Sequence, residues 1–168
     1  PFLPWESIFL NAGCIHSNPL KEQAMSEYEA GNYATAVMTF DKAILENPEE
    51  SELYYLKGLA LFELVRYKDA TDSFTGAIRI TPDYSLAWYW KGSASFMMGD
   101  YDEAVRSFYK AITIEPANTE YWYYRGLALS GRGQYDLAIA HFDKALLIDP
   151  TYEKGWSSMG YAYVMEKN

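Results

Sequence analysis

The sequence predicts an all-α solenoid built from antiparallel helix pairs, and three observations predict it. A pattern of aromatic, glycine, alanine and proline residues recurs every 34 residues without insertion or deletion. Each copy contains two segments, such as 86–98 and 102–114, with apolar and small residues at helical spacing. A turn residue separates the two segments and a proline follows the second, so each copy reads as two short helices.

The copy at 85–118 shows the pattern most clearly. Its signature residues are Trp88, Gly92, Gly99, Tyr101, Ala104, Phe108, Ala111 and Pro116. The same residue types stand 34 positions later, and they stand 34 and 68 positions earlier with a few replacements. The replacements are Tyr54, Val65, Leu20 and Ala24.

These columns resemble the tetratricopeptide repeat, a helix–turn–helix unit of about 34 residues. The resemblance covers roughly residues 17 to 168. It implies a right-handed superhelix with a concave surface lined mainly by the first helix of each pair. It also implies a scaffold that holds segments of other proteins, since that is what tetratricopeptide domains generally do.

The repeat register divides the chain into six parts. They are an apolar N-terminal arm or capping helix at 1–16, repeats at 17–50, 51–84, 85–118 and 119–152, and a partial fifth repeat or C-terminal capping helix at 153–168. The arm is rich in apolar residues such as Phe2, Trp5 and Ile8. We expect a short helix there that covers the first repeat; the alternative is that the arm lies in a concave groove, its own or a neighbour's.

Small residues are expected where the two helices of a pair cross. In the third repeat, Gly92, Ala104 and Ala111 allow the backbones to approach. Trp88 and Phe108 are expected to fill the space beside them, so that large side chains pack into small ones.

The turn between the helices depends on a residue in the left-handed conformation. Gly99 adopts this conformation at little cost, and Asp100 or Asp102 can accept hydrogen bonds from the free N–H groups of the second helix. The second repeat carries Val65 at the equivalent position. We therefore expect either strain on the order of 1 kcal/mol at Val65 or a shifted turn.

The fifth copy ends after its first helix. Trp156, Met159, Gly160 and Tyr163 repeat the inward pattern of a first helix, but no second helix follows them. We expect either a longer native chain or end-to-end stacking into a homo-oligomer.

A column of cations precedes the helix-crossing glycines of the middle repeats: Lys57, Lys91 and Arg125. One interpretation is a basic stripe for an acidic ligand. The other, which we favour, is structural: the stems lie along the helix pair and the charged ends reach helix carbonyls or acids such as Glu115 and Asp149.

Composition excludes several classes of function. The net charge of −9 argues against nucleic acid, and no apolar run reaches the roughly 20 residues of a membrane-inserted helix. The single cysteine, Cys14, excludes an internal disulfide framework and favours a cytoplasmic setting. His16 and His141 are isolated, so we expect no catalytic residues, no metal site, no cofactor and no enzyme activity.

The most specific hypothesis is an aromatic concave groove for an apolar or proline-containing peptide. Residues 34 apart become neighbours across stacked repeats and would form ladders of rings. The predicted groove residues are Tyr55, Leu56, Leu59, Tyr89, Trp90, Tyr123, Tyr124 and Leu127. The alternative is that some rings pack between repeats. We favour this for Phe62 and Phe96, but less for the Tyr and Trp columns, because Tyr54 and Trp88 are expected to fill the interior on adjacent faces.

Acidic residues flank the predicted groove. They are Glu22, Glu52, Glu63 and Glu120. They would favour a ligand with one or two basic residues and repel acidic tails. The sequence thus predicts a protein–protein interaction scaffold, and the alternative is a structural element that assembles through its exposed ends or its N-terminal arm.

Overall fold

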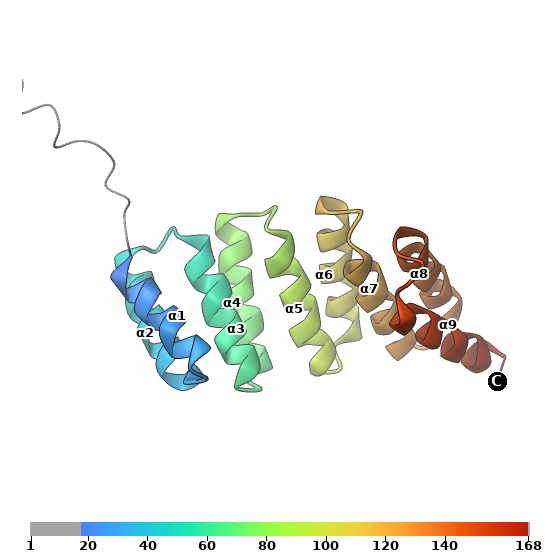
Figure 1. Ribbon diagram of the computed structural model, residues 1–168, viewed down its shortest axis with the longest axis horizontal. Helices are drawn as coiled ribbons and strands as arrows, with labels where there is room; N and C mark the ends of the chain where they lie inside the picture. The colour runs from blue at the N-terminus through green and yellow to red at the C-terminus, as the bar shows by residue number, and fades with distance from the viewer. Residues whose placement is uncertain (1–17, 168) are drawn as a thin grey trace, which may run out of the picture.

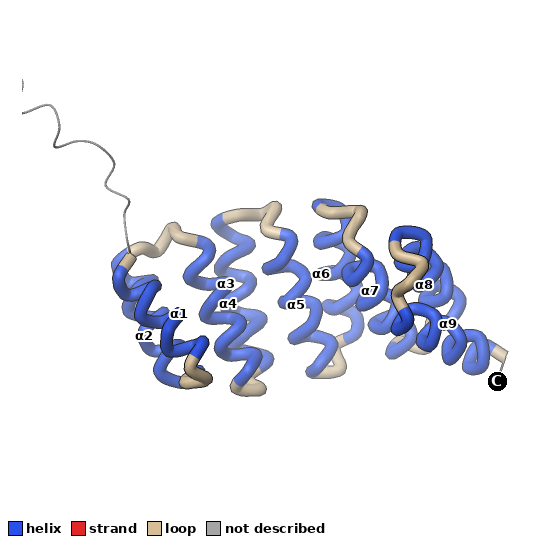
Figure 2. Tube along the Cα trace, viewed as in Figure 1, coloured by secondary structure: helices blue, strands red, loops and turns tan. Residues whose placement is uncertain are grey.

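The computed structural model describes residues 18–167, which form nine helices and no strand (Figures 1 and 2). The first helices of the repeats are α1 (Pro19–Glu29), α3 (Ser51–Glu63), α5 (Ser85–Met97), α7 (Thr119–Gly131) and α9 (Glu153–Glu166). The second helices are α2 (Tyr33–Glu46), α4 (Tyr67–Ile80), α6 (Tyr101–Ile114) and α8 (Tyr135–Ile148). The predicted N-terminal arm at 1–16 lies outside the described residues.

The helix pairs follow one another along the long axis of the molecule (Figure 1). Each helix packs against the next helix in the chain, and each first helix also contacts the first helix of the next repeat. Within residues 18–167 no helix contacts a more distant one. Stability in such an array is a sum of repeat and nearest-neighbour terms.

The core follows the predicted columns. One phenylalanine from each second helix is completely buried: Phe40, Phe74, Phe108 and Phe142. Opposite the last three rings the first helix carries a glycine, and a Cβ at Gly92 would lie only 2.9 Å from the Phe108 ring. The expected packing of a ring against a backbone without a side chain is therefore confirmed.

The aromatic residue near the start of α3, α5, α7 and α9 lies elsewhere than expected. Trp88 is only half-buried, and its indole Nε1 donates a hydrogen bond to the carbonyl of Pro82 at 2.8 Å. The prediction that Trp88 fills the interior is wrong, because its ring is drawn to the end of the preceding repeat. Equivalent bonds join Tyr54 to Pro48, Trp122 to Pro116 and Trp156 to Pro150.

The turn in the second repeat has the same build as the others in spite of its valine. Val65 has a φ of +61° and Gly99 a φ of +77°. The Val65 amide donates to the Phe62 carbonyl and the Arg66 amide to the Leu61 carbonyl, both at 2.9 Å, which is the hydrogen-bonded helix end typical of a left-handed residue. Val65 therefore adopts the left-handed conformation, as the first of the two alternatives expects, and a shifted turn is excluded.

Val65→Gly is expected to raise the free energy of unfolding by about 1 kcal/mol, because a β-branched residue is costly in this conformation. The Val65 side chain is largely exposed, so its removal forfeits little packing. The measurement is thermal unfolding followed by circular dichroism. Gly99→Val is the matched control and should lower the melting temperature; a lower melting temperature for Val65→Gly as well would contradict the argument.

The second helix of the third repeat starts as predicted. The Asp100 side chain accepts a hydrogen bond from the amide of Glu103 at 3.1 Å, which satisfies one of the free donors of α6.

The C-terminal helix α9 packs against α8 through Gly155 and contacts α7. Ala162 is buried, whereas Trp156, Tyr161 and Tyr163 remain exposed. The last described helix therefore presents aromatic side chains to solvent.

Candidate protein-binding surface

The predicted groove residues all belong to α3, α5 and α7, three first helices that lie in succession along one side of the array. We call the surface formed by α1, α3, α5, α7 and α9 the first-helix face (Figure 1). Because these helices contact one another in order, residues at one register position become neighbours along this face.

Aromatic rings on this face contact each other between repeats. The Trp90 ring lies 5.1 Å from Phe62 of the preceding repeat, edge to face. The Tyr124 ring lies 5.4 Å from Tyr89 and is stacked at 6.0 Å on Phe108. Such ring pairs stabilise the junctions between repeats beyond the area that they bury.

Two of the predicted groove residues lie in the core. Tyr89 is 9% exposed and Tyr123 is 8% exposed, and both rings pack against the buried phenylalanines Phe108 and Phe142. Burial raises the pKa of the Tyr89 hydroxyl far above its ordinary value. The assumption that both tyrosines are open to a ligand is wrong, because they, and not Trp88, fill the space between repeats.

The other six predicted residues are half-buried and keep accessible surface. They are Tyr55, Leu56, Leu59, Trp90, Tyr124 and Leu127. Burial raises the pKa of Tyr55 to about 12, so its hydroxyl is protonated and can donate a hydrogen bond. Phe62 and Phe96 pack on the second helices of their own repeats, with ring distances of 5.1 Å to Tyr67 and 5.4 Å to Tyr101.

A cavity of about 240 Å³ lies between α7 and α9. It is lined by Leu127, Ser130, Phe142, Ser157, Ser158 and Tyr161. Ser157 and Ser158 take the register positions that Tyr123 and Tyr124 hold one repeat earlier, so small side chains leave the space that rings fill elsewhere. This replacement was visible in the sequence, but the groove prediction stopped at Leu127.

The acidic residues that flank the face are all exposed: Glu22, Glu52, Glu63 and Glu120. One of them is not free, because Glu52 forms an ion pair with Lys21, which also binds Glu50 at 2.9 Å. The Lys21 charge, shared between Glu50 and Glu52, partly neutralises the Glu52 carboxylate.

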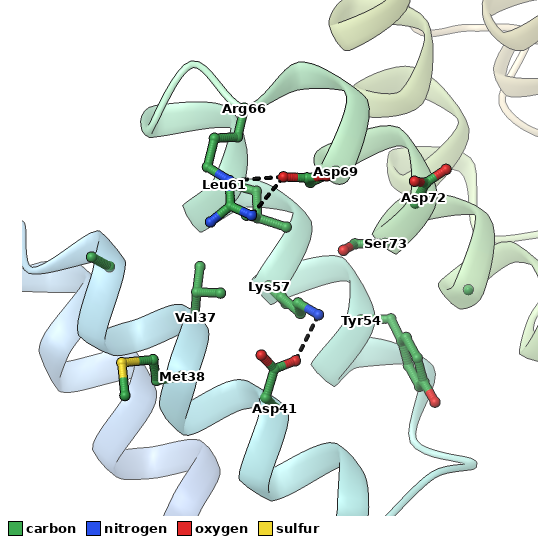
Figure 3. A pocket seen from close by; sticks show the side chains of 12 residues that line it. Val37, Met38, Asp41, Tyr54, Lys57, Leu61, Arg66, Asp69, Asp72 and Ser73 are labelled. Carbon is green, nitrogen blue, oxygen red and sulfur yellow. Dashed lines mark hydrogen bonds and ion pairs between the residues drawn. The ribbon is translucent and has the colours of Figure 1, made fainter.

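The cation column lies on the other side of the first helices, toward the second helices. Lys57 forms an ion pair with Asp41 at 2.6 Å across the junction of the first two repeats. Figure 3 shows this pair among the residues that line a cavity of about 640 Å³ between α2, α3 and α4, together with the ion pair of Arg66 and Asp69. Lys57 therefore has a structural role, because its charge is neutralised by Asp41.

The second cation is also paired. Lys91 lies 2.9 Å from Glu103 on α6, and both side chains are largely buried. Although burial raises the pKa of Glu103, hydrogen bonds from Lys91 and Arg106 lower it overall. The structural interpretation is correct for Lys57 and Lys91, but the partners are Asp41 and Glu103.

The acids named from the sequence have other roles. Glu115 accepts a hydrogen bond from Ser85, and Asp149 accepts bonds from Thr151 at the turn before α9. Both therefore stabilise helix starts and loops rather than the cation column.

The described part of the chain, 18–167, holds no group of three or more His, Cys, Asp and Glu residues that could bind a metal ion. In the same range, none of the helices has the length and hydropathy needed to cross a membrane.

Comparison with known proteins agrees with this geometry. Models of the tetratricopeptide repeat match residues 21–85, 85–118 and 119–152. The chain belongs to the tetratricopeptide repeat family, and its predicted fold class, an all-α solenoid of antiparallel helix pairs, is confirmed. A comparison with curated protein sequences gave no match.

Solved structures share the fold. MamA residues 41 to the end, from Desulfovibrio magneticus RS-1, is 23% identical with a TM-score of 0.84, covering 89% of this chain and 84% of that one. YrrB, described as a TPR protein with an unusual peptide-binding site, is 22% identical with a TM-score of 0.78, covering 89% and 77%. At these identities the likeness concerns the fold. A helical repeat scaffold for protein interaction is the class of protein that the family and fold define.

Proposed function

We propose that the first-helix face binds an apolar or proline-containing peptide segment of another protein, and that the chain acts as a scaffold without catalytic activity. The observation that carries the proposal is the pair of half-buried rings Trp90 and Tyr124 in the middle of this face. Large rings with a polar tip bury much area at low entropic cost and can hydrogen-bond a peptide backbone.

Three further features support this proposal. Leu59 and Leu127 extend the apolar surface on either side of the two rings. The cavity next to Leu127 can hold one apolar side chain of a ligand. YrrB, which has the same fold, is described as having a peptide-binding site.

The buried Tyr89 and Tyr123 have a supporting role in this proposal. Tyr89 contacts both Trp90 and Tyr124, with ring distances of 5.5 and 5.4 Å. Tyr123 contacts Tyr124 at 5.2 Å. The buried rings thus hold the accessible ones in place, and a preorganised surface loses less entropy on binding.

The test is a peptide-array screen with wild type and the double variant Trp90→Ala, Tyr124→Ala. Each truncation should cost roughly 2 kcal/mol of binding if the rings are the anchors of the ligand. The double variant must keep its helical circular dichroism signal, because Trp90 also packs on Phe62.

The matched control is Met38→Ala, Leu147→Ala, which truncates two exposed apolar residues of the second helices. This control should retain the captured peptides. Equal capture by wild type and the Trp90, Tyr124 variant would contradict the groove. That result would favour the second candidate function, assembly through the array ends, which the exposed Trp156 and Tyr161 of α9 support.

A further inference from the structure

The third cation of the column differs from the other two in what surrounds it. Lys57 is neutralised from the second helix of the preceding repeat, by Asp41. Lys91 is neutralised from the second helix of its own repeat, by Glu103. The repeat therefore offers two register positions from which a carboxylate can reach the cation.

Neither of the two equivalent positions around Arg125 carries an acidic residue. The position of Asp41 is taken by Tyr109, and the position of Glu103 is taken by Leu137. Among residues 18–167 no carboxylate pairs with Arg125, whose guanidinium lies 4.8 Å from the centre of the Tyr109 ring. Its Nε is buried and has no hydrogen-bond partner in the described structure.

A half-buried guanidinium without a carboxylate is costly to the fold. Burial lowers the pKa of Arg125, although it stays protonated at neutral pH because an arginine side chain titrates far above that range. A buried donor without an acceptor forfeits a hydrogen bond that water would otherwise supply. A hydrogen-bond acceptor supplied by another protein would offset this cost.

The surroundings of Arg125 are open and apolar. Tyr109 is 50% exposed and Leu137 is 51% exposed, so the two residues that replaced the acids form an accessible rim. His141 lies beside them and bonds the Leu137 carbonyl through Nδ1 at 2.8 Å. Burial lowers the pKa of His141, the hydrogen bond to the Leu137 carbonyl opposes this, and nearby Arg125 lowers the pKa further.

We propose that Arg125, Tyr109 and Leu137 form a docking site for an aspartate or glutamate side chain of a partner protein, with an adjacent apolar residue of the partner packed on the rim. The array itself shows the chemistry, because a carboxylate completes the same position in the two preceding repeats. A guanidinium can donate two parallel hydrogen bonds to the two oxygens of a carboxylate.

The site favours a carboxylate over a phosphate group. A phosphate carries up to two charges and is usually held by a cluster of cations, whereas Arg125 is a single cation among apolar neighbours. Arg125 directly follows Tyr124 on α7, but its guanidinium meets the exposed ring of Tyr109 on α6, whereas Tyr124 contacts Tyr89 and Phe108. The site therefore uses side chains other than those of the proposed peptide groove.

The experiment is an NMR titration of the ¹⁵N-labelled protein, read at the Nε–Hε signal of Arg125. The probes are N-acetyl-Glu-Leu-amide and its neutral analogue N-acetyl-Gln-Leu-amide. The glutamate probe should shift the signal with an affinity roughly tenfold higher than that of the glutamine probe, since only the former gives a charged hydrogen bond. Equal shifts with both probes, or no shift with either, would overturn the proposal.

The matched variants change Leu137, at the position where the preceding repeat carries Glu103. Leu137→Glu restores the acid of the preceding repeat and should occupy Arg125 from within, so that the glutamate probe no longer binds. Leu137→Gln should keep most of the binding. Both variants retain Arg125, so they test the site without removing the half-buried cation from the fold. Unchanged binding in Leu137→Glu would overturn the proposal.

Discussion

Phe108→Ala is expected to lower the free energy of unfolding by about 3–5 kcal/mol, the usual cost of removing a fully buried ring. Phe108 is completely buried and contacts the rings of Tyr89 and Tyr124, so its ring belongs both to its own helix pair and to the junction with the next repeat. The measurement is urea unfolding followed by far-ultraviolet circular dichroism.

Met97→Ala is the control for this variant, because Met97 is exposed near the end of α5. Its effect should stay within about 0.5 kcal/mol. Hydrogen exchange adds a spatial readout: in a nearest-neighbour array, Phe108→Ala should accelerate exchange in α5, α6 and α7 more than in α1 and α2. An equal loss of stability in both variants would contradict the assignment of Phe108 to the core.

Gly126→Leu is expected to cost about 1–3 kcal/mol or more, because it forces extra atoms into a filled core. A Cβ at Gly126 would lie 2.6 Å from the ring of Phe142, which is completely buried, and the longer leucine side chain would collide with this ring. The measurement is the same urea titration. The slope m, with which the free energy of unfolding falls as the urea concentration rises, should be unchanged if the folded state is otherwise intact.

Gly160 offers a matched control, since it holds the same register position one repeat later. A Cβ at Gly160 would meet nothing within 4 Å, because no second helix packs there in the described chain. Gly160→Ala should therefore stabilise α9 by about 0.5–1 kcal/mol through helix propensity alone. If both substitutions destabilised the protein to the same degree, the helix crossing would not be the cause.

The columns that repeat every 34 residues could be predicted because each of them has a local physical reason. Gly99 ends a helix in a conformation that other residues avoid, and Phe108 needs a partner without a side chain at Gly92. The exception could be identified in the same way, because the position of Val65 in the repeat indicates either strain or a shifted turn there. These features depend on contacts within one repeat or with the next one.

The orientation of neighbouring aromatic residues could not be predicted in the same way. Trp88 and Tyr89 are adjacent on α5, and both are large and amphipathic. Which ring enters the core depends on the angle at which successive helix pairs stack, and the sequence does not state this angle. The structure buries Tyr89 and leaves Trp88 at the edge.

The partners of the cation column were missed for a related reason. Lys57 reaches back to Asp41 in the preceding repeat, whereas Lys91 reaches forward to Glu103 in its own. Only the three-dimensional stacking shows that both acids approach the same point. The register then reveals that Arg125 has neither acid, a comparison that required the structure to identify the two positions.

The bonds from the repeated tryptophans to proline carbonyls give the protein an internal optical probe. Trp88, Trp122 and Trp156 each donate to the end of the preceding repeat, at 2.8, 2.8 and 3.0 Å. Indole emission is sensitive to the loss of such a bond and to contact with water. The fluorescence of these three tryptophans therefore reports on the contacts between successive repeats, whereas circular dichroism reports on the helices themselves. A difference between the two signals during unfolding would mark repeats that separate before they melt.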